Sequence, residues 1–338
     1  MMGTKAFEIL QLGREATPGT NVAATTKWRG PGATFRDARE VIFPNEDIGI
    51  VGGTDRSYTP SVLAEFDTYE TEVTFEQTPH VMEASIATAT PSADGAGTGK
   101  IYSYPLHDTV EPVYTVLKTY SAEFGDSSQY EEASFCVCSE WELKGKAEEA
   151  WKFTSKWFGR EVANTTKTAG VAIPTVFDAL FQKTKLYVDV VSGNFGTTQI
   201  TGTFLEATVK CVTGWYPIFV GDGDLFFKEP GFDSEKYSLT VDFTFLMGTA
   251  AAAQRDLWRL ETPRLLQMKT EGPALTSAGT TYTFRTLIQN YAGKWQMFDP
   301  ISTQNGTSIV KASFLNRYNA TKADRGNIIF VNELASLP

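Results

Sequence analysis

Two pairs of carboxylates in the sequence have a spacing that suits acid–base chemistry. Glu70 and Glu72 form the first pair, and Glu140 and Glu142 form the second. Residues i and i+2 of one strand lie about 7 Å apart, which overlaps the separation of the two carboxyl groups in inverting glycosidases. Three interpretations stay open: a solvent-facing strand row, a hydrolytic pair, or an acidic wall that repels phosphates from a passage.

The two histidines do not complete a catalytic triad. His107 stands beside Asp108, and His80 falls in the first turn of a predicted short helix. The sequence has no Gly-x-Ser-x-Gly nucleophile elbow that would supply a serine. We therefore assign no catalytic residue and expect the protein not to be an enzyme.

Glycine-rich and acidic turns also fall short of ligand sites. The stretch from Thr90 to Lys100 is similar to a phosphate-binding loop, but Ile101 stands where Ser or Thr should follow the lysine. Asp222 and Asp224 lie in an acidic turn that lacks the full oxygen-ligand set of a calcium loop. The sequence therefore predicts no metal and no cofactor.

The composition is that of a soluble, strand-rich protein. The 338 residues carry a net charge of −10, and 13% of them are aromatic. The negative charge argues against a protein that binds nucleic acid tightly. It does not argue against one that nucleic acid passes without binding. The three cysteines lack disulfide-framework and zinc spacing, so we expect reduced thiols. We find no apolar run of membrane-span length and no export signal, and we expect a protein made in the cytoplasm.

The stretch Tyr237–Phe245 is the clearest strand in the sequence. Apolar and polar residues alternate along it, which predicts one buried and one wet face, and a short helix is predicted from Thr249. The motif Tyr-x-x-x-Val-x-Phe of this strand recurs weakly from Tyr69 to Phe75, where it precedes a predicted helix start at Thr78–Pro79. The order of strand then helix thus occurs once in each half of the chain.

For the remaining chain, the sequence predicts short strands joined by turns. An alternating hairpin is predicted from Ala133–Leu143 and Trp151–Phe158. We predict an all-β, β-rich fold with short helices, built as two tandem β-sandwich or barrel domains. The predicted boundaries are an extended N-terminal arm at 1–30, a first domain at 31–165, a linker at 166–183 and a second domain at 184–338.

Several segments resemble the major tail (tail tube) proteins of long-tailed, siphovirus-type bacteriophages. The first is Gly13–Thr25, and the second is Arg56–Pro60 leading into the strand that ends at Phe75. The third, Trp141–Arg160, is similar to the hairpin that precedes the domain junction in that family.

The resemblance implies a structural virion protein whose β-sheets close into rings that stack as a tail tube. The apparent doubling favours trimeric, pseudo-hexameric rings over hexameric rings. The implied partners are further copies of the chain, a tape-measure protein, and the tail terminator and distal tail proteins. DNA would pass through without specific binding, and the protein would reside in the virion tail. The alternatives are a carbohydrate-binding or hydrolysing β-sandwich and another virion β-protein.

The same hypothesis assigns roles to particular residues. Polar strand faces are the candidate lumen surface, and the N-terminal arm and the loop at 43–58 are candidate assembly elements. The candidate lumen-facing residues are Glu70, Glu72, Thr240 and Asp242. The candidate inter-ring arm residues are Gly13, Glu15, Thr17 and Thr20.

Overall fold

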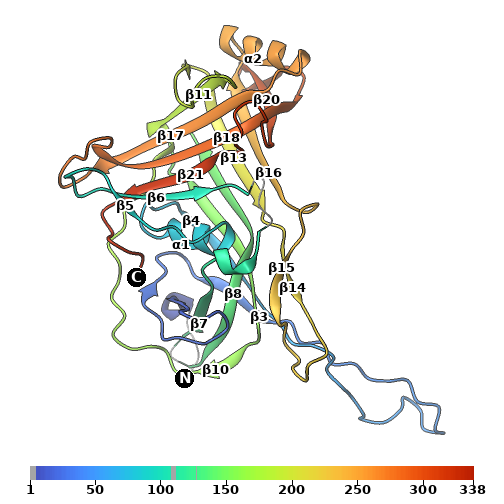
Figure 1. The fold of residues 1–338 in the computed structure, drawn as a ribbon. Coiled ribbons are helices and arrows are strands. Elements are labelled where there is room, and N and C mark those ends of the chain that lie inside the picture. Colours follow the sequence, from blue (N-terminus) through green and yellow to red (C-terminus); the bar gives the residue numbers. More distant parts are fainter. Residues whose placement is uncertain (1–4, 108–111, 127) are drawn as a thin grey trace.

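The computed structural model describes residues 5–107, 112–126 and 128–338. Antiparallel strands dominate these residues, and the two α-helices, α1 (Thr78–Ser85) and α2 (Thr249–Arg259), are short. The prediction of an all-β fold with short helices is therefore confirmed. Figure 1 shows strongly twisted sheets from which one long loop projects.

The first half of the chain forms ten strands within the described residues. They are β1 (Ile9–Arg14), β2 (Thr26–Lys27), β3 (Ala33–Asp37), β4 (Ala64–Glu72), β5 (Ser92–Ala93), β6 (Lys100–Pro105), β7 (Tyr120–Gly125), β8 (Tyr130–Lys146), β9 (Lys152–Gly159) and β10 (Ala163–Thr165). Single turns of 3₁₀ helix occur at Lys5–Phe7 and Tyr114–Val116.

The second half forms eleven strands after a 3₁₀ turn at Phe181–Lys183. They are β11 (Thr184–Val190), β12 (Gln199–Ile200), β13 (Phe204–Val212), β14 (Trp215–Ile218), β15 (Glu229–Phe232), β16 (Ser238–Leu246), β17 (Arg264–Ala274), β18 (Phe284–Phe298), β19 (Ser302–Gln304), β20 (Thr307–Asn316) and β21 (Asn327–Asn332).

Two long strands change pairing partners along their length. The first part of β8 pairs with β7 and β10, and its second part pairs with β9 and β13. β18 repeats this arrangement, because its first part pairs with β17 and β21 and its last residues pair with β20. A central sheet results, with the strand order β3-β4-β9-β8-β13-β16-β20-β18.

The pairing pattern of the first half recurs in the second half, in the same chain order. The pairs β1–β2, β1–β7, β7–β8, β8–β10, β8–β9, β4–β9 and β3–β4 correspond to β11–β12, β11–β17, β17–β18, β18–β21, β18–β20, β16–β20 and β13–β16. α1 follows β4 as α2 follows β16. We infer an internal repeat, whose two copies share one sheet through β8–β13 and β21–β6. The predicted division into two domains at 166–183 stays a prediction.

The sequence echo that suggested the repeat lies in a different register from the structural one. β4 ends at Glu72, so Val73 and Phe75 follow the strand, whereas Val241 and Phe243 lie within β16. Pairing with the neighbouring strands instead places Asp67 of β4 at the position of Asp242 of β16, because they face Lys156 and Ser313 at matching places of β9 and β20. The order of strand then helix was predicted correctly, and the residue alignment was wrong.

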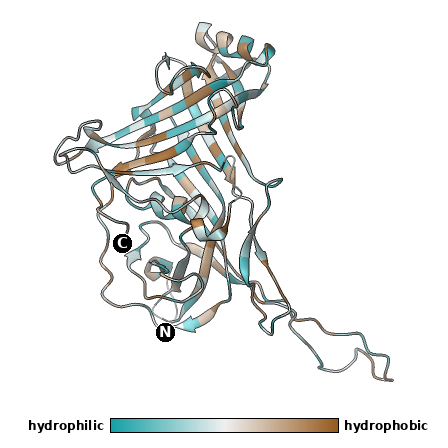
Figure 2. Ribbon diagram, in the orientation of Figure 1, coloured by the Kyte–Doolittle hydropathy of each residue, from teal (hydrophilic) through white to brown (hydrophobic). Residues whose placement is uncertain are grey.

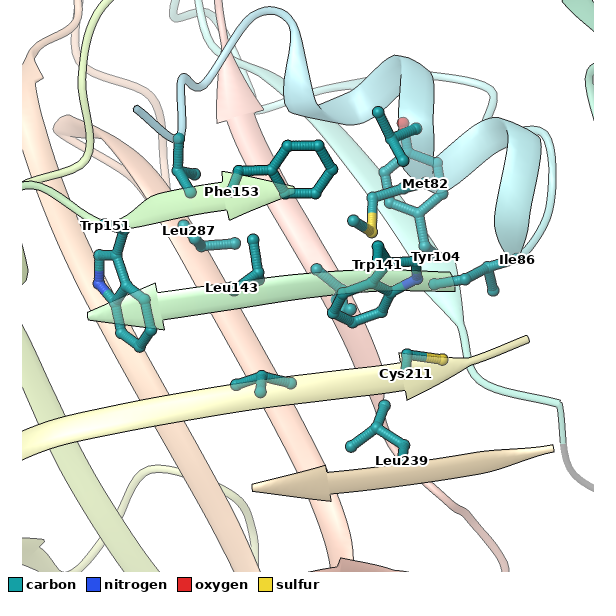
Figure 3. Close-up of a cluster of buried hydrophobic side chains, with 14 of the residues drawn as sticks. Met82, Ile86, Tyr104, Trp141, Leu143, Trp151, Phe153, Cys211, Leu239 and Leu287 are labelled. Carbon is teal, nitrogen blue, oxygen red and sulfur yellow. The ribbon is translucent and has the colours of Figure 1, made fainter. Parts of the chain in front are cut away.

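One hydrophobic core lies on the inner face of the central sheet and runs across both repeats. Trp141 and Trp151 are fully buried there, and Cys211 and Leu239 extend the same layer into the second repeat. Figure 3 shows Met82 of α1, and Ile86 directly after the helix, lying over these strands. All eight residues of α1 are buried, whereas in α2 only Ala251 is. The same helix position is therefore covered in the first repeat and open in the second.

The long β3–β4 loop, residues 38–63, extends away from the rest of the chain (Figures 1 and 2). Its only strand-like contact among the described residues is the bridge between Ile42 and Tyr58. The β14–β15 hairpin occupies the corresponding connection of the second repeat, between β13 and β16. Both connections leave the same end of the central sheet, since β3–β4 and β13–β16 are equivalent pairs.

Candidate functional site

The outer face of the central sheet carries rows of polar residues that cross both repeats. Directly paired residues of a sheet share a face, so the pairing registers define these rows. One row runs through Glu72, Lys152, Lys144, Thr208, Asp242 and Ser313. A second row runs through Thr154, Glu142, Lys210, Thr240, Leu315 and Lys294.

Three of the four predicted lumen residues therefore lie on one surface. Glu72 and Asp242 stand in the same row, although they come from different repeats, and Thr240 stands in the next row. Glu70 differs, because the β4–β9 register shifts between Thr68 and Thr71 and places it in a bulge. Whether this surface lines a passage stays a prediction.

This surface has mixed charge, which corrects the expectation of an acidic wall. Lysines from β8, β9 and β13 are interleaved with the carboxylates at the ion-pairing distance of 4 Å or less. The pairs are Lys152–Glu72 at 2.8 Å, Lys156–Glu140 at 3.2 Å, Lys210–Glu140 at 3.1 Å and Lys146–Glu206 at 3.9 Å. The sequence spacing of the glutamates was correct, but it did not show which cations the neighbouring strands bring.

The Glu140 carboxyl does not have the electrostatics of a general acid. Partial burial by itself would raise the pKa of the Glu140 carboxyl, but hydrogen bonds from Lys210 and Lys156 hold it below its ordinary value. A hydrogen bond from Lys152 likewise lowers the pKa of Glu72. Carboxylates kept ionised in this way are poor general acids, the role that glycoside cleavage requires of one of the two.

The predicted N-terminal arm is partly a strand inside the fold. Gly13 lies in β1, between β2 and β7, and Glu15 follows it with 1% of its surface exposed. Glu15 accepts hydrogen bonds from the amides of Gly19 and Phe135 and from the hydroxyls of Thr119 and Ser121. Gly13 and Glu15 are thus held within the monomer and are not free to reach another ring. Thr17 and Thr20 are exposed, so their predicted role stays a prediction.

Replacing Glu15 with alanine should destabilise the monomer strongly. The substitution leaves two amides and two hydroxyls, three of them buried, without their acceptor, and each such loss costs about 1 kcal/mol or more. We expect the free energy of unfolding to fall by about 3 kcal/mol. Urea denaturation would measure this, with Thr17→Ala as the exposed control that changes it by less than about 0.5 kcal/mol. Equal midpoints for the two variants would contradict the structural role of Glu15.

The histidines occupy structural positions. His80 is buried on α1, where its Nδ1 lies 3.0 Å from the Tyr120 hydroxyl, and burial lowers its pKa to about 3. The ring of His107 packs edge-on against Trp215 and Phe232. Asp108, its sequence neighbour, lies outside the described residues.

No group of three or more His, Cys, Asp or Glu residues in the described chain is arranged to hold a metal ion. The three cysteines are free and buried. Among the described helices, neither is long and apolar enough to cross a membrane.

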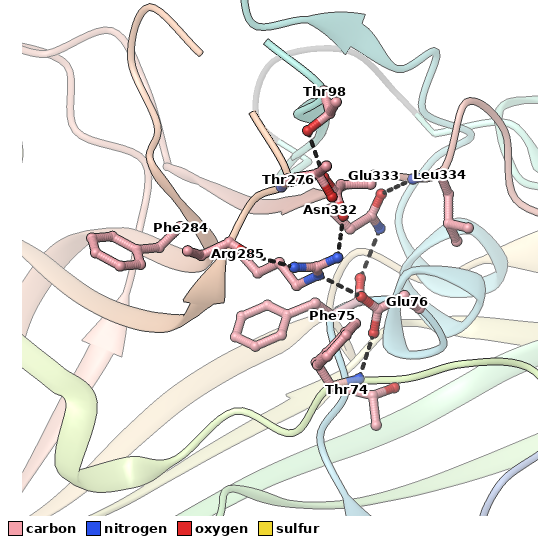
Figure 4. A network of polar contacts seen from close by, with 12 residues as sticks. Thr74, Phe75, Glu76, Thr98, Thr276, Phe284, Arg285, Asn332, Glu333 and Leu334 are labelled. Carbon is pink, nitrogen blue, oxygen red and sulfur yellow. Dashed lines mark hydrogen bonds and ion pairs between the residues drawn. The ribbon is translucent and has the colours of Figure 1, made fainter. Parts of the chain in front are cut away.

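A buried ion-pair network ties the predicted linker to both repeats (Figure 4). Arg285 of β18 pairs with Glu76 at 3.3 Å and with Glu333, and its guanidinium stacks 4.0 Å from the centre of the Phe177 ring. Glu76, which precedes α1, also accepts a hydrogen bond from the amide of Phe177. The segment around Phe177 is therefore fastened to the fold by buried polar contacts.

The network should make stability depend on pH. Burial raises the pKa of Glu76 to about 7, because desolvation outweighs the Phe177 amide and the charge of Arg285. Between its ordinary pKa of 4.5 and about 7, the folded state holds a proton that the unfolded state has lost. This stabilisation is complete below pH 4.5 and is lost as the pH rises through 7, so the free energy of unfolding should fall by about 2 kcal/mol from pH 5 to pH 8.

The variant Glu76→Gln isolates that contribution. It keeps a side chain that can accept hydrogen bonds but cannot ionise, so the fall in stability between pH 5 and pH 8 should disappear. Denaturant midpoints at both pH values would measure it, with the exposed Glu70→Gln as the control. An unchanged pH slope in Glu76→Gln would show that other groups cause the dependence.

The central sheet ends in two open edges. β3 pairs with β4 on one side and with no other described strand. The last residues of β18, Lys294–Phe298, pair with no described strand other than β20, because the β17 ladder stops at Gly293, and the carbonyl of Gln296 accepts a hydrogen bond from the Trp258 indole of α2. An open edge presents unpaired backbone N–H and C=O groups to any strand of another chain. The sequence did not predict which strands would be the edges.

Apolar side chains gather on the projecting β3–β4 loop. Val41, Phe43, Ile48 and Ile50 are exposed, and the exposure of Val51 is 104% of its reference value. A cluster of exposed apolar residues on one segment marks an interaction site more often than scattered single ones do. The predicted assembly loop at 43–58 lies within this segment, and its role stays a prediction.

No protein-family model matches the sequence, and no curated protein matches it at a significant level.

Proposed function

We propose that the protein is a structural subunit that polymerises as stacked rings into a tube, namely the tail tube of a long-tailed bacteriophage. The observation that carries the proposal is the central sheet, which has two open edges, a polar outer face and a core on its inner face. A rotation that joins one edge of each copy to the opposite edge of the next closes into a ring. Closure also satisfies the edge backbone groups.

The size of the sheet favours three chains per ring. Each copy contributes eight strands, so three copies supply about 24, which closes to about 45–50 Å across at the backbone. After the side chains are allowed for, a lumen about 35–40 Å wide remains, which is wide enough for a DNA duplex. The internal repeat makes such a ring pseudo-hexameric. Hexameric rings remain the alternative.

The outer polar face suits a lumen wall. Its lysines are largely held by carboxylates, which limits their attraction for phosphates and lets DNA pass without specific binding. A tape-measure protein would fill the tube before DNA does, and terminator and distal tail proteins would cap its two ends. The exposed β3–β4 loop supplies apolar contacts between copies. Residence in the virion tail follows from the same proposal.

Reversing charge on this face should slow DNA passage without preventing assembly. Glu72→Lys and Asp242→Lys place new cations in one row and release Lys152 from its partner. We expect DNA ejection to slow about tenfold, because free cations bind phosphates. Ejection kinetics of assembled particles would measure it, with Glu261→Lys, an exposed site outside the central sheet, as the control. Unchanged kinetics would remove this face from the lumen.

Negative-stain electron microscopy of the concentrated protein, with size analysis alongside, tests the proposal itself. Long hollow tubes with a regular axial repeat are expected, and the mass per ring distinguishes three chains from six. A single closed ring without filaments would favour another virion β-protein. A monomer at every concentration, combined with saturable glycan binding, would overturn the proposal in favour of the carbohydrate-binding alternative.

A further inference from the structure

We propose that β18 of one copy pairs with β3 of the next copy in the register that joins β8 to β13 inside the chain. This inference rests on the proposed ring assembly and specifies its contact residue by residue. In the internal repeat, β8 corresponds to β18 and β13 corresponds to β3. The chain therefore already contains one example of the contact, and its two open edges are the halves of a second.

β3 matches β13 in sequence as well as in pairing. Ala33 and Thr34 face Thr68 and Asp67 of β4, while Ala207 and Thr208 face Phe243 and Asp242 of β16. The two strands read Ala-Thr-Phe-Arg from residue 33 and Ala-Thr-Val-Lys from residue 207. Arg36 thus occupies the position of Lys210.

A shared bulge aligns β18 with β8. The β8–β9 register shifts between Cys138 and Glu140, and the β18–β20 register shifts between Trp295 and Met297. Beyond the shift, Glu142 stands opposite Thr154, and the amide of Asp299 bonds to the carbonyl of Lys311 at the corresponding place. Asp299 therefore occupies the position of Glu142.

The backbone groups at the two edges point in the directions that this pairing needs, and one of them, the carbonyl of Gln296, also accepts a hydrogen bond from the Trp258 indole. The bonds from Ala147 to Leu205 and from Thr213 to Ser139 show that β13 bonds to β8 through its odd-numbered residues, including Cys211. On β3, the bonds from Tyr69 to Gly32 and from Ala38 to Leu63 direct the even-numbered residues toward β4.

The odd-numbered backbone groups of β3, including those of Asp37, therefore face the open edge. On β18, the bond from Asp299 to Lys311 leaves the backbone of Phe298 facing the other open edge. Cys211 pairs with Trp141 inside the chain, and Asp37 and Phe298 are the equivalents of these two residues. Pro300 has no backbone N–H to donate at this edge, so the hydrogen-bond ladder between β18 and β3 of the next copy is short.

The register places Arg36 opposite Asp299 of the next copy, as Lys210 stands opposite Glu142 inside the chain. The charge signs match, although the residue types differ. Arg36 is 71% exposed in the monomer and is held only loosely, at 3.5 Å, by Glu65. Asp299 has no ion-pair partner among the described residues within 4 Å. The two side chains are thus available to each other.

The same correspondence between the two repeats suggests what the projecting β3–β4 loop contacts. The β14–β15 hairpin covers Val137 and Phe158 of the first repeat through Trp215 and Phe227. The equivalent pair in the second repeat, Lys294 and Leu315, has no such cover in the monomer. The β3–β4 loop of the next copy reaches this place, so its exposed apolar side chains gain a surface to pack on.

Disulfide trapping in the full chain tests the register. With Arg36→Cys and Asp299→Cys, oxidation by copper phenanthroline after assembly should join neighbouring copies, because directly opposed residues lie about 4.5–5.5 Å apart between Cα atoms. The two thiols lose two electrons and two protons to the oxidant as the S–S bond forms. A non-reducing gel should show a ladder that ends at the number of chains in the ring.

Matched variants keep the result interpretable. Lys210→Cys with Glu142→Cys reproduces the pair within one chain and should consume thiols without raising the mass. Arg36→Cys with Lys294→Cys tests a wrong register and should give no ladder. The native cysteines are buried and should not react.

The outcomes separate this inference from the function on which it rests. Tubes or rings without cross-links in the Arg36/Asp299 variant would overturn the register and leave the proposed function standing. A protein that neither assembles nor cross-links at any concentration would overturn both. A ladder that is equally strong in the wrong-register variant would also overturn the register.

Discussion

Asp37→Pro should abolish ring assembly while leaving a folded monomer. The N–H of Asp37 points away from β4 toward the open edge of the central sheet, so its loss breaks no bond within the chain. Proline is tolerated in an edge strand when the missing N–H faces solvent. The side chain of Asp37 is exposed, and its contact with Arg39 at 3.4 Å is a surface pair that contributes little.

The same substitution acts directly on the contact between copies. Proline removes a ladder donor, and its ring occupies the space that the incoming strand requires, at a cost of about 1–3 kcal/mol for the acceptor left unpaired at each contact. Every contact between neighbouring copies in the ring has this cost. The protein concentration needed for assembly should therefore rise by at least about 100-fold. Sedimentation velocity over a concentration series would measure the shift, and electron microscopy would show whether tubes are lost.

Asp37→Ala is the matched control, because it removes the carboxylate but keeps the N–H. It should assemble like the unmodified protein. Circular dichroism and denaturant midpoints should be nearly the same for both variants, which shows that proline has not unfolded the monomer. Tubes formed by Asp37→Pro at the unmodified concentration would show that β3 is not an assembly edge.

The local structure was predictable from the sequence where periodicity was strong. The alternation in Tyr237–Phe245 and in Trp151–Phe158 gave strands close to β16 and β9, because a period of two places every second side chain in the core. The helix starts at Thr78 and Thr249 were also predicted correctly. These signals are carried by adjacent residues, so they can be read without the fold.

Long-range pairing was not predictable in the same way. The repeat was recognised through a motif in the wrong register, and the matching Ala-Thr segments at Ala33 and Ala207 were missed. The two copies differ by insertions, including β6 and the β14–β15 hairpin, so no single offset aligns them. The bulges after Cys138 and Trp295 align the two copies, and they are a property of strand pairs.

For the candidate surface too, local features were predictable from the sequence and long-range contacts were not. The positions of Glu72, Thr240 and Asp242 on wet strand faces followed from alternation, and the structure places them on one face. Their cationic neighbours came from other strands, so the expected acidic wall proved to be a mixed one. Glu15 was assigned to an arm because Gly, Pro and Thr surround it, whereas three of the donors to its carboxylate lie more than 100 residues away from it in the chain.

Shortening the β3–β4 loop should separate folding from assembly even more clearly than the edge variant does. Replacing residues 44–56 with Asn–Gly leaves a two-residue turn beyond the Ile42–Tyr58 bridge, which suits a tight hairpin. Most residues of the removed stretch are exposed, and a Cβ added at Gly49, Gly52 or Gly53 would meet no atom within 4 Å. The free energy of unfolding should therefore change by less than about 0.5 kcal/mol.

Assembly of the shortened variant should be lost, because the loop would pack over Lys294 and Leu315 of the next copy. A second variant keeps the loop at full length but carries Ile48→Ser, Ile50→Ser and Val51→Ser. It distinguishes the effect of apolar contact from the effect of loop length. If apolar burial provides the attraction, this variant should also fail to form tubes, since each fully buried aliphatic side chain contributes about 1.5–3 kcal/mol. Normal tubes from the serine variant alone would mean that loop length matters and apolar contact does not. Normal tubes from both would mean that the loop belongs to a different surface, and that the open edges alone hold the ring together.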